Sequence, residues 1–257
     1  MSSTLSLAAI VACGCLVVAS AAPAADAVPR PLRGVQRIVT LGDSITEGGE
    51  QPGGYVWLIR KSLTYLYPEA GFEVVNAGIS GHKSTDMQAR FQRDVLDKHP
   101  QLVTISVGVN DVWHGFYDNH PKGDGPRGVP LAQYKEKVTQ MIDAAQAAGI
   151  QVVLLSTTVI MEDPKSPENE KLKAYNAALK SLARQKHCKF IDLNTPFHKA
   201  IAEHRKATGD TKNWLTADGV HMTPRGNRMM ASLILKGLGV PLKAQEAAFS
   251  QPGVPGI

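Results

Sequence analysis

The sequence predicts an α/β protein in which one parallel sheet lies between two layers of helices, a three-layer α/β/α domain. One observation behind this prediction is that five short runs rich in Val, Ile and Leu recur along the chain. Near-continuous apolar runs are typical of parallel strands that are buried on both faces. The second observation is that segments of helical period separate the runs, which implies right-handed βαβ units.

Each element follows from its own stretch of sequence. Five strands are expected where apolar residues run almost without interruption: QRIVTLG (36–42), FEVVNAG (72–78), QLVTISVG (101–108), QVVLLST (151–157) and KFIDL (189–193). Five helices are expected where apolar residues recur at helical spacing: 55–67, 84–98, 131–148, 168–186 and 224–238. The elements alternate from the first strand to the last helix, so they describe one sheet rather than two.

One domain accounts for most of the chain. A chain of 257 residues with 43% hydrophobic content is long enough for one sizeable core, and we see no internal repeat. We expect the domain to span residues 28–245. Residues 246–257, which end in SQPGVPGI, are expected to form a loose C-terminal tail.

Residues 1–27 have the composition of a secretory signal peptide. The stretch LSLAAIVACGCLVVASAAPAADA is apolar and then rich in small residues with several A-x-A sites, although no Lys or Arg precedes it. One alternative is a membrane anchor, since the apolar stretch from Leu5 to Ala22 is about the minimum length for a span. Another is a lipoprotein signal at Cys13. The favoured prediction is a secreted or periplasmic protein with no stable membrane insertion after cleavage.

Cysteine content and charge argue against a disulfide-bonded protein and against a nucleic-acid-binding protein. Cys13 and Cys15 lie in the presumed signal, which leaves Cys188 without a partner for an internal disulfide. The net charge is +5, but Lys and Arg are scattered without interleaved aromatic residues. A solvated surface explains this pattern better than nucleic-acid binding does.

Polar residues and glycines follow the predicted strands. Gly42-Asp43-Ser44 ends the first strand, Gly78 the second, and Asn110 follows the third. In an open parallel sheet the binding crevice lies at the carboxyl ends of the strands. Ser44 taken alone is equally well explained as a helix N-cap, so the other positions decide its role.

The residue types suit acyl transfer. A serine hydroxyl needs a base to take its proton, and His221 fits that role. Asp218, three residues before it, can orient the imidazole and stabilise the imidazolium. The backbone amides of Ser44 and Gly78 and the side-chain amide of Asn110 can form an oxyanion hole, in which each donor contributes about 3–4 kcal/mol.

These residues resemble the four sequence blocks of the SGNH hydrolases, also called GDSL esterases and lipases. The blocks are Gly42-Asp43-Ser44, Gly78, Gly108-Val109-Asn110-Asp111 and Asp218-Gly219-Val220-His221, and the resemblance covers about residues 36–238. Ile45 stands where the family nickname has Leu. The resemblance implies a flavodoxin-like five-stranded sheet in the order 2-1-3-4-5, no metal and no cofactor. It also implies ester hydrolysis through an acyl-enzyme on Ser44, with His221 as base and then acid, Asp218 as its partner, and Gly78 and Asn110 as oxyanion donors.

Two other interpretations fit less well. The motif G-x-S-x-G of the α/β-hydrolase elbow is absent around Ser44. The loop WHGFYDNHPKGDG contains two His and two Asp, but their spacing matches no zinc or calcium pattern. Asp43 and Asp111 are expected to hold loops rather than to take part in catalysis.

The loop from Trp113 to Pro130 is expected to form one wall of the cleft. Trp113, Phe116 and Tyr117 are candidates to stack on a sugar face, and His114 to contact an ester, although the aromatic residues would equally serve to pack the loop. Export together with this aromatic platform favours a serine esterase that removes short acyl groups, with O-acetylated carbohydrate as substrate. A lysophospholipase or acyl-thioesterase is the enzymatic alternative, and a non-catalytic carbohydrate-binding module is the alternative from another class. The sequence does not indicate an oligomeric state.

Overall fold

The computed structural model describes residues 27–256, so the expected signal peptide lies almost entirely outside the described residues. A single sheet of five parallel strands crosses the molecule in the order β2-β1-β3-β4-β5. Its strands are β1 (Arg37–Gly42), β2 (Glu73–Gly78), β3 (Leu102–Ser106), β4 (Gln151–Leu155) and β5 (Lys189–Ile191). The predicted fold class and strand order are confirmed.

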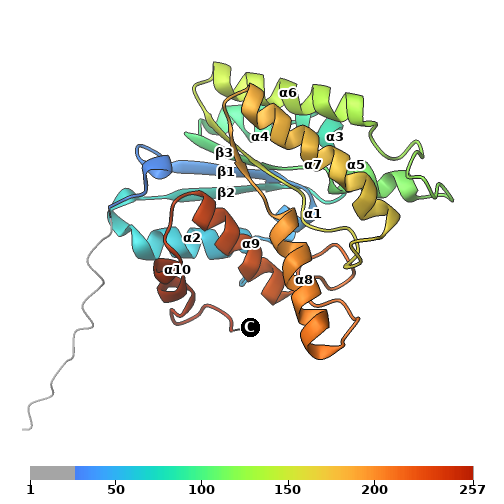
Figure 1. The fold of residues 1–257 in the computed structure, drawn as a ribbon. Coiled ribbons are helices and arrows are strands. Elements are labelled where there is room, and N and C mark those ends of the chain that lie inside the picture. The colour runs from blue at the N-terminus through green and yellow to red at the C-terminus, as the bar shows by residue number, and fades with distance from the viewer. Residues whose placement is uncertain (1–26, 257) are drawn as a thin grey trace, which may run out of the picture.

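Helices cover both faces of the sheet (Figure 1). One layer contains α3 (Ser84–Ala89), α4 (Phe91–Asp94), α5 (Val109–Trp113), α6 (Leu131–Ala147) and α7 (Pro167–Gln185). The other contains α2 (Tyr55–Leu66), α9 (Pro224–Gly237) and α10 (Leu242–Phe249), with α8 (Asn194–Thr208) beside α9. The short helix α1 (Ser44–Gly48) packs against the end of β2.

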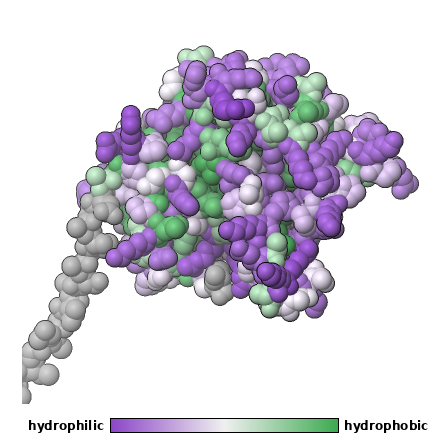
Figure 2. Space-filling view, viewed as in Figure 1, coloured by the Kyte–Doolittle hydropathy of each residue, from purple (hydrophilic) through white to green (hydrophobic). Residues whose placement is uncertain are grey.

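The two helical layers explain the uninterrupted apolar strands. Every residue of β3 is buried, and so are Ile38, Val39 and Leu41 on β1. Side chains alternate between the two faces of a strand, and here both faces meet helices. The outer surface seen in Figure 2 is mainly hydrophilic, with small apolar areas between the polar side chains.

The parallel register brings the ends of three strands together. Gly42 at the end of β1 pairs with Gly78 at the end of β2, while β3 lies on the other side of β1. The loops that leave these strands therefore meet at one edge of the sheet, where the sequence places its candidate residues.

Local periodicity did not predict every helix. The expected helix over 84–98 is α3, α4 and a 3-10 turn (Leu96–Lys98), because the backbone leaves helical geometry at Arg90 and again at Val95. The polar helix α8 was missed, since Phe197 and Ile201 are its only fully buried residues. The short helices α1 and α5 were missed as well.

The C-terminal boundary also differs from the expectation. Residue 245 lies inside α10, which continues to Phe249 and buries Ala248 and Phe249. Val254 packs against the core beyond the helix. Apolar residues in this segment therefore attach it to the domain. Within residues 27–256, no helix is both long and apolar enough to cross a membrane.

Candidate active site

Ser44 begins α1 directly after β1, and Asp43 provides the cap of that helix. The Asp43 carboxylate accepts a hydrogen bond from the amide of Ile45 at 3.0 Å. The Ser44 hydroxyl is left to interact with the ring of His221, with 2.8 Å between Oγ and Nε2. The structure therefore separates the capping role from the role of Ser44.

His221 and Asp218 continue the hydrogen-bonded chain. His221 Nδ1 lies 2.6 Å from Asp218 Oδ2, and Asp218 Oδ1 accepts from the amides of Val220 and His221 at 3.0 and 2.8 Å. Burial opposes ionisation of Asp218, but the hydrogen bonds from the His221 ring and from the two amides outweigh it and hold the pKa of Asp218 below its usual value. The carboxylate is thus ionised and fixed against one nitrogen of the imidazole, while the other nitrogen faces the serine.

A buried glutamate holds the loop that carries this pair. Glu162 Oε1 accepts from the amides of Leu215 and Thr216 at 2.7 and 2.6 Å, and Oε2 accepts from the amide of Trp214 at 2.9 Å. The Thr216 hydroxyl adds a fourth hydrogen bond at 2.8 Å. The neighbouring Met161 amide donates to the carbonyl of Gly219 at 2.8 Å. The segment after β4 therefore fixes the backbone on both sides of Asp218.

The three expected oxyanion donors differ in whether their N–H groups already have hydrogen-bond acceptors. The Ser44 amide has no hydrogen-bond acceptor within residues 27–256. The buried side chain of Asn110 donates one hydrogen bond to the carbonyl of His82 at 3.1 Å, which leaves its second N–H without a protein acceptor in the described part. The Gly78 amide donates to Asn76 Oδ1 at 2.8 Å.

The structure gives Gly78 a packing reason as well. A Cβ atom at this position would lie 2.1 Å from the backbone nitrogen of Glu47 in α1. Only a residue without a side chain lets α1 cross the end of β2 so closely. The close approach of α1 to the end of β2 therefore explains the glycine at this position.

Two carboxyls lie beneath the site. Asp43 and Asp111 are both buried, and burial raises their pKa values to about 6 and about 7. Asp111 accepts hydrogen bonds from the amide and hydroxyl of Ser84 and so joins α5 to α3. In the part of the chain that the structure describes, neither carboxyl is hydrogen-bonded to the Ser44 hydroxyl, and both hold the loops that lead out of the strands.

The aromatic residues of the 113–130 loop form a cluster. The rings of His114 and Tyr117 stack with centroids 4.9 Å apart, and the Arg127 guanidinium lies 4.6 Å from the Tyr117 ring centroid. Trp113 meets Tyr117 edge to face at 5.7 Å and, like Phe116, packs against the core. Trp113, His114, Phe116 and Tyr117 are all partly buried.

The polar residues of the same loop pair with one another. His120 lies 3.5 Å from Asp124, and Asp118 lies 3.7 Å from Arg127. Within residues 27–256, no group of three or more His, Cys, Asp or Glu side chains is arranged to hold a metal.

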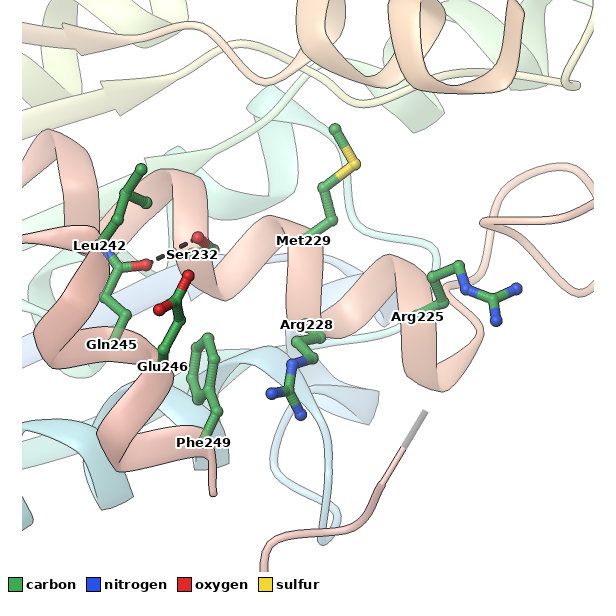
Figure 3. A pocket seen from close by; sticks show the side chains of 8 residues that line it. All are labelled: Arg225, Arg228, Met229, Ser232, Leu242, Gln245, Glu246 and Phe249. Carbon is green, nitrogen blue, oxygen red and sulfur yellow. Dashed lines mark hydrogen bonds between the residues drawn. The ribbon is translucent and has the colours of Figure 1, made fainter. Parts of the chain in front are cut away.

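A surface groove lies away from these residues. It has a volume of about 270 Å³ and runs between α9 and α10, where Met229, Leu242 and Phe249 line it together with Arg225 and Arg228 (Figure 3). A hydrogen bond of 2.6 Å between Ser232 and Gln245 crosses its floor. None of Ser44, Asp218 and His221 lines it.

Comparison with known proteins gives consistent matches over most of the chain. The sequence pattern of the GDSL-like lipase/acylhydrolase family matches residues 40–229. The acetylxylan esterase of Geobacillus stearothermophilus is 27% identical over 215 residues, which cover 79% of this chain and 94% of that protein. The isoamyl acetate-hydrolyzing esterase of Saccharomyces cerevisiae is 23% identical over 220 residues, 78% of this chain and 85% of that protein.

Solved structures agree with these matches. The crystal structure of an acetyl xylan esterase superposes with a TM-score of 0.70 at 29% identity and covers 78% of this chain and 98% of that one. Structures of catalytic mutants of the Geobacillus enzyme, in which a serine, an aspartate or a histidine is replaced by alanine, match at 26% identity.

Proposed function

Because this chain belongs to the GDSL-like lipase/acylhydrolase family and is a carboxylic ester hydrolase, we propose that it hydrolyses short-chain acyl esters through an acyl-enzyme on Ser44. The observation that carries the proposal is the continuous hydrogen-bonded chain from Ser44 Oγ through His221 to Asp218, with distances of 2.8 and 2.6 Å. A serine, a histidine and an aspartate are also the residues replaced in the catalytic mutants of the Geobacillus relative. Since the family consists of hydrolases, a purely carbohydrate-binding role is set aside.

The reaction proceeds in two halves. His221 Nε2 takes the proton of Ser44 Oγ as the oxygen attacks the ester carbonyl, and Asp218 stabilises the imidazolium. The tetrahedral intermediate collapses when His221 returns the proton to the leaving alcohol, which leaves the acyl group on Ser44. Water then repeats the sequence, with His221 as base, and releases the carboxylic acid.

The developing oxyanion would accept from the Ser44 amide and from the second N–H of Asn110. The Gly78 amide joins them when it exchanges Asn76 Oδ1 for the oxyanion. Asn110→Ala should lower kcat about 100- to 1,000-fold with a much smaller change in KM, because the donor acts on charge that exists only in the transition state. Steady-state kinetics on p-nitrophenyl acetate measure this, and an unchanged kcat would remove Asn110 from the oxyanion hole.

We propose acetyl groups on carbohydrate as the natural substrate. Two relatives are named for acetate esters, one of xylan and one of isoamyl alcohol, which supports a small acyl group. The partly exposed His114–Tyr117 stack supports a sugar as the alcohol part, because aromatic rings offer apolar faces to sugar rings. A lysophospholipase or acyl-thioesterase remains the second candidate.

The decisive experiment compares hydrolysis of p-nitrophenyl acetate, butyrate and octanoate with release of acetate from acetylated xylo-oligosaccharides. We expect rates that fall with acyl length and that vanish in Ser44→Ala. Ser250→Ala, on an exposed hydroxyl, is the matched control and should keep full activity. Preference for octanoate would favour the second candidate, and Ser44-independent turnover would refute the mechanism.

A companion variant tests the sugar contact. Tyr117→Ala should raise KM for the acetylated oligosaccharide several-fold and leave KM for p-nitrophenyl acetate unchanged, since only the first has a sugar to stack. Equal effects on both substrates would assign the aromatic cluster to loop packing.

We further propose that the protein is exported. The uncharged apolar N-terminal segment with its small-residue sites supports export. Expression of the full chain in a bacterium, followed by mass spectrometry of the exported protein, should find a new N-terminus between Ala21 and Val28. An uncleaved protein in the membrane fraction would favour the anchor.

A further inference from the structure

Arg90 is a buried arginine at the break between α3 and α4, and it contacts the neighbours of all three proposed oxyanion donors. Its side chain is 6% exposed. Nη2 donates to the carbonyl of Gly42 at 2.9 Å, Nη1 to the carbonyl of Ala77 at 2.9 Å, and Nε to His82 Nδ1 at 3.0 Å. One guanidinium thus joins the ends of β1 and β2 to the loop before α3.

Each contact lies close to one donor along the chain. The Ala77 carbonyl belongs to the same peptide group as the Gly78 amide, so a hydrogen bond to its oxygen fixes the plane of that amide and strengthens it as a donor. The Gly42 carbonyl closes β1 immediately before Asp43 and Ser44. The backbone carbonyl of His82 is the group that holds the side-chain amide of Asn110.

The charge of Arg90 is balanced locally. Asp94 Oδ2 accepts from Nη1 at 2.7 Å, and hydrogen bonds from Arg93 and Arg90 hold the pKa of Asp94 at about 2 although burial opposes this. Because His82 Nδ1 accepts from Arg90, the ring of His82 is neutral with its proton on Nε2. The planar fork of a guanidinium is needed for these contacts, and a lysine ammonium cannot reproduce their geometry.

Building on the esterase mechanism proposed above, we propose that Arg90 is the positioning residue of the oxyanion hole. It sets the mutual placement of the Ser44 amide, the Gly78 amide and the Asn110 side chain without touching the substrate. Its loss should therefore slow formation of the tetrahedral intermediate and leave ground-state binding nearly unchanged.

Arg60, on α2, is a control that contacts the same sheet from a less buried position, with its side chain 30% exposed. It also donates to a carbonyl of β2, that of Val74 at 3.0 and 2.8 Å, and forms a paired contact with the carboxylate of Glu50 at 2.7 and 2.8 Å. Val74 lies near the start of β2, away from the strand end. Loss of Arg60 should cost stability through the same kinds of bonds without reaching the oxyanion donors.

The experiment compares Arg90→Met and Arg90→Lys with Arg60→Met and Arg60→Lys. Three readouts are taken on each folded variant: kcat and KM for p-nitrophenyl acetate, the inhibition constant of a small alkylboronic acid, and the thermal unfolding temperature. The boronic acid forms a tetrahedral adduct on serine, so its affinity reports the oxyanion hole rather than ground-state binding. We expect the Arg90 variants to lose about 100-fold in kcat, with KM within about 3-fold and boronate affinity reduced in parallel.

The Arg60 variants should unfold at a lower temperature than the parent, while their kcat and boronate affinity stay within about 3-fold of the parent values. If Arg90→Met does not fold, Arg90→Lys gives the same test, because it retains the charge and the bulk. The proposal is overturned if the Arg90 variants keep kcat and boronate affinity, or if they lose no more of either than the Arg60 variants.

Ser44→Ala in the same assay separates the role of Arg90 from the esterase mechanism. Activity in Ser44→Ala refutes the mechanism, whereas its inactivity beside fully active Arg90 variants refutes only the role of Arg90.

Discussion

At the scale of single residues, Asp43 caps α1 and Ser44 contacts His221, whereas the sequence alone does not show which of the two is the cap. Both are good helix-capping residues, and the sequence places both at the start of α1. The Asp43 carboxylate accepts from the first turn of that helix, and the Ser44 hydroxyl meets His221. Ser44→Ala is therefore expected to remove the hydroxyl from the site without removing the helix cap.

Asp111 makes the stability of the protein depend on pH. Burial raises its pKa from the usual 3.8 to about 7, so between these values the folded state keeps a proton that the unfolded state has released. The contribution of this group to stability is fully present below pH 3.8 and is lost as the pH rises to about 7. Asp111→Asn, whose side-chain oxygen can still accept from Ser84, should reduce the loss of stability between pH 5 and pH 7 by about 2 kcal/mol.

Urea unfolding of the parent and of Asp111→Asn at pH 5 and pH 7 measures this difference. Asp43, whose pKa is also raised, stays in both proteins and therefore leaves a residual pH dependence. An equal pH dependence in the two proteins would contradict a proton held by Asp111.

At the scale of elements, the packing of α1 depends on Gly78 at the end of β2. Gly78→Ala would place a methyl group against the backbone of Glu47, and no side-chain rotation relieves that contact. We expect a loss of about 1–3 kcal/mol of stability and a fall in kcat, because α1 carries Ser44. Gly48→Ala on the same helix is the control, since a Cβ there meets no atom within 4 Å and should change stability by less than about 0.5 kcal/mol. Chemical unfolding and kinetics of both variants measure these effects, and equal stability of the two would disprove the packing role of Gly78.

The loop with Asp218 and His221 depends on a carboxylate from another element. Glu162→Gln keeps the volume but turns an N–H donor towards the amides of 214–216, which can only donate. We expect the free energy of unfolding to fall by about 2–3 kcal/mol, and kcat to fall because the imidazole is less well fixed. Glu170→Gln, which removes only an exposed ion pair with Lys173, should cost less than about 0.5 kcal/mol. Urea unfolding measures both, and similar losses would show that the buried carboxylate has no special role.

At the scale of the whole molecule, the C-terminal segment closes one helical layer. α10 packs on both α2 and α9, and residues 251–254 line a cavity of about 250 Å³ together with Trp57, Lys61 and Tyr65 of α2. Deletion of residues 250–257 should lower the free energy of unfolding by about 1 kcal/mol through loss of the Val254 contact, while kcat stays unchanged because the proposed site lies at the strand ends. Deletion of residues 255–257 alone keeps Val254 and should have a smaller effect. Thermal unfolding distinguishes the two truncations. Unaltered stability after deletion of residues 250–257 would support a loose tail.

The sequence by itself determined the class of the fold, the order of its elements and the family. Apolar strands and helical periods are local patterns, and the residues around Ser44, Asn110 and His221 stand in recognisable order along the chain. It did not determine the break at Arg90, the helix α8, the engagement of Gly78 by Asn76, or the tasks of Glu162 and Arg90. Each of these depends on hydrogen bonds or packing between segments far apart in sequence, such as Arg90 with Gly42 and Glu162 with Trp214. Such contacts leave no periodicity or motif, because they arise only when the folded chain brings the strand ends and their loops together.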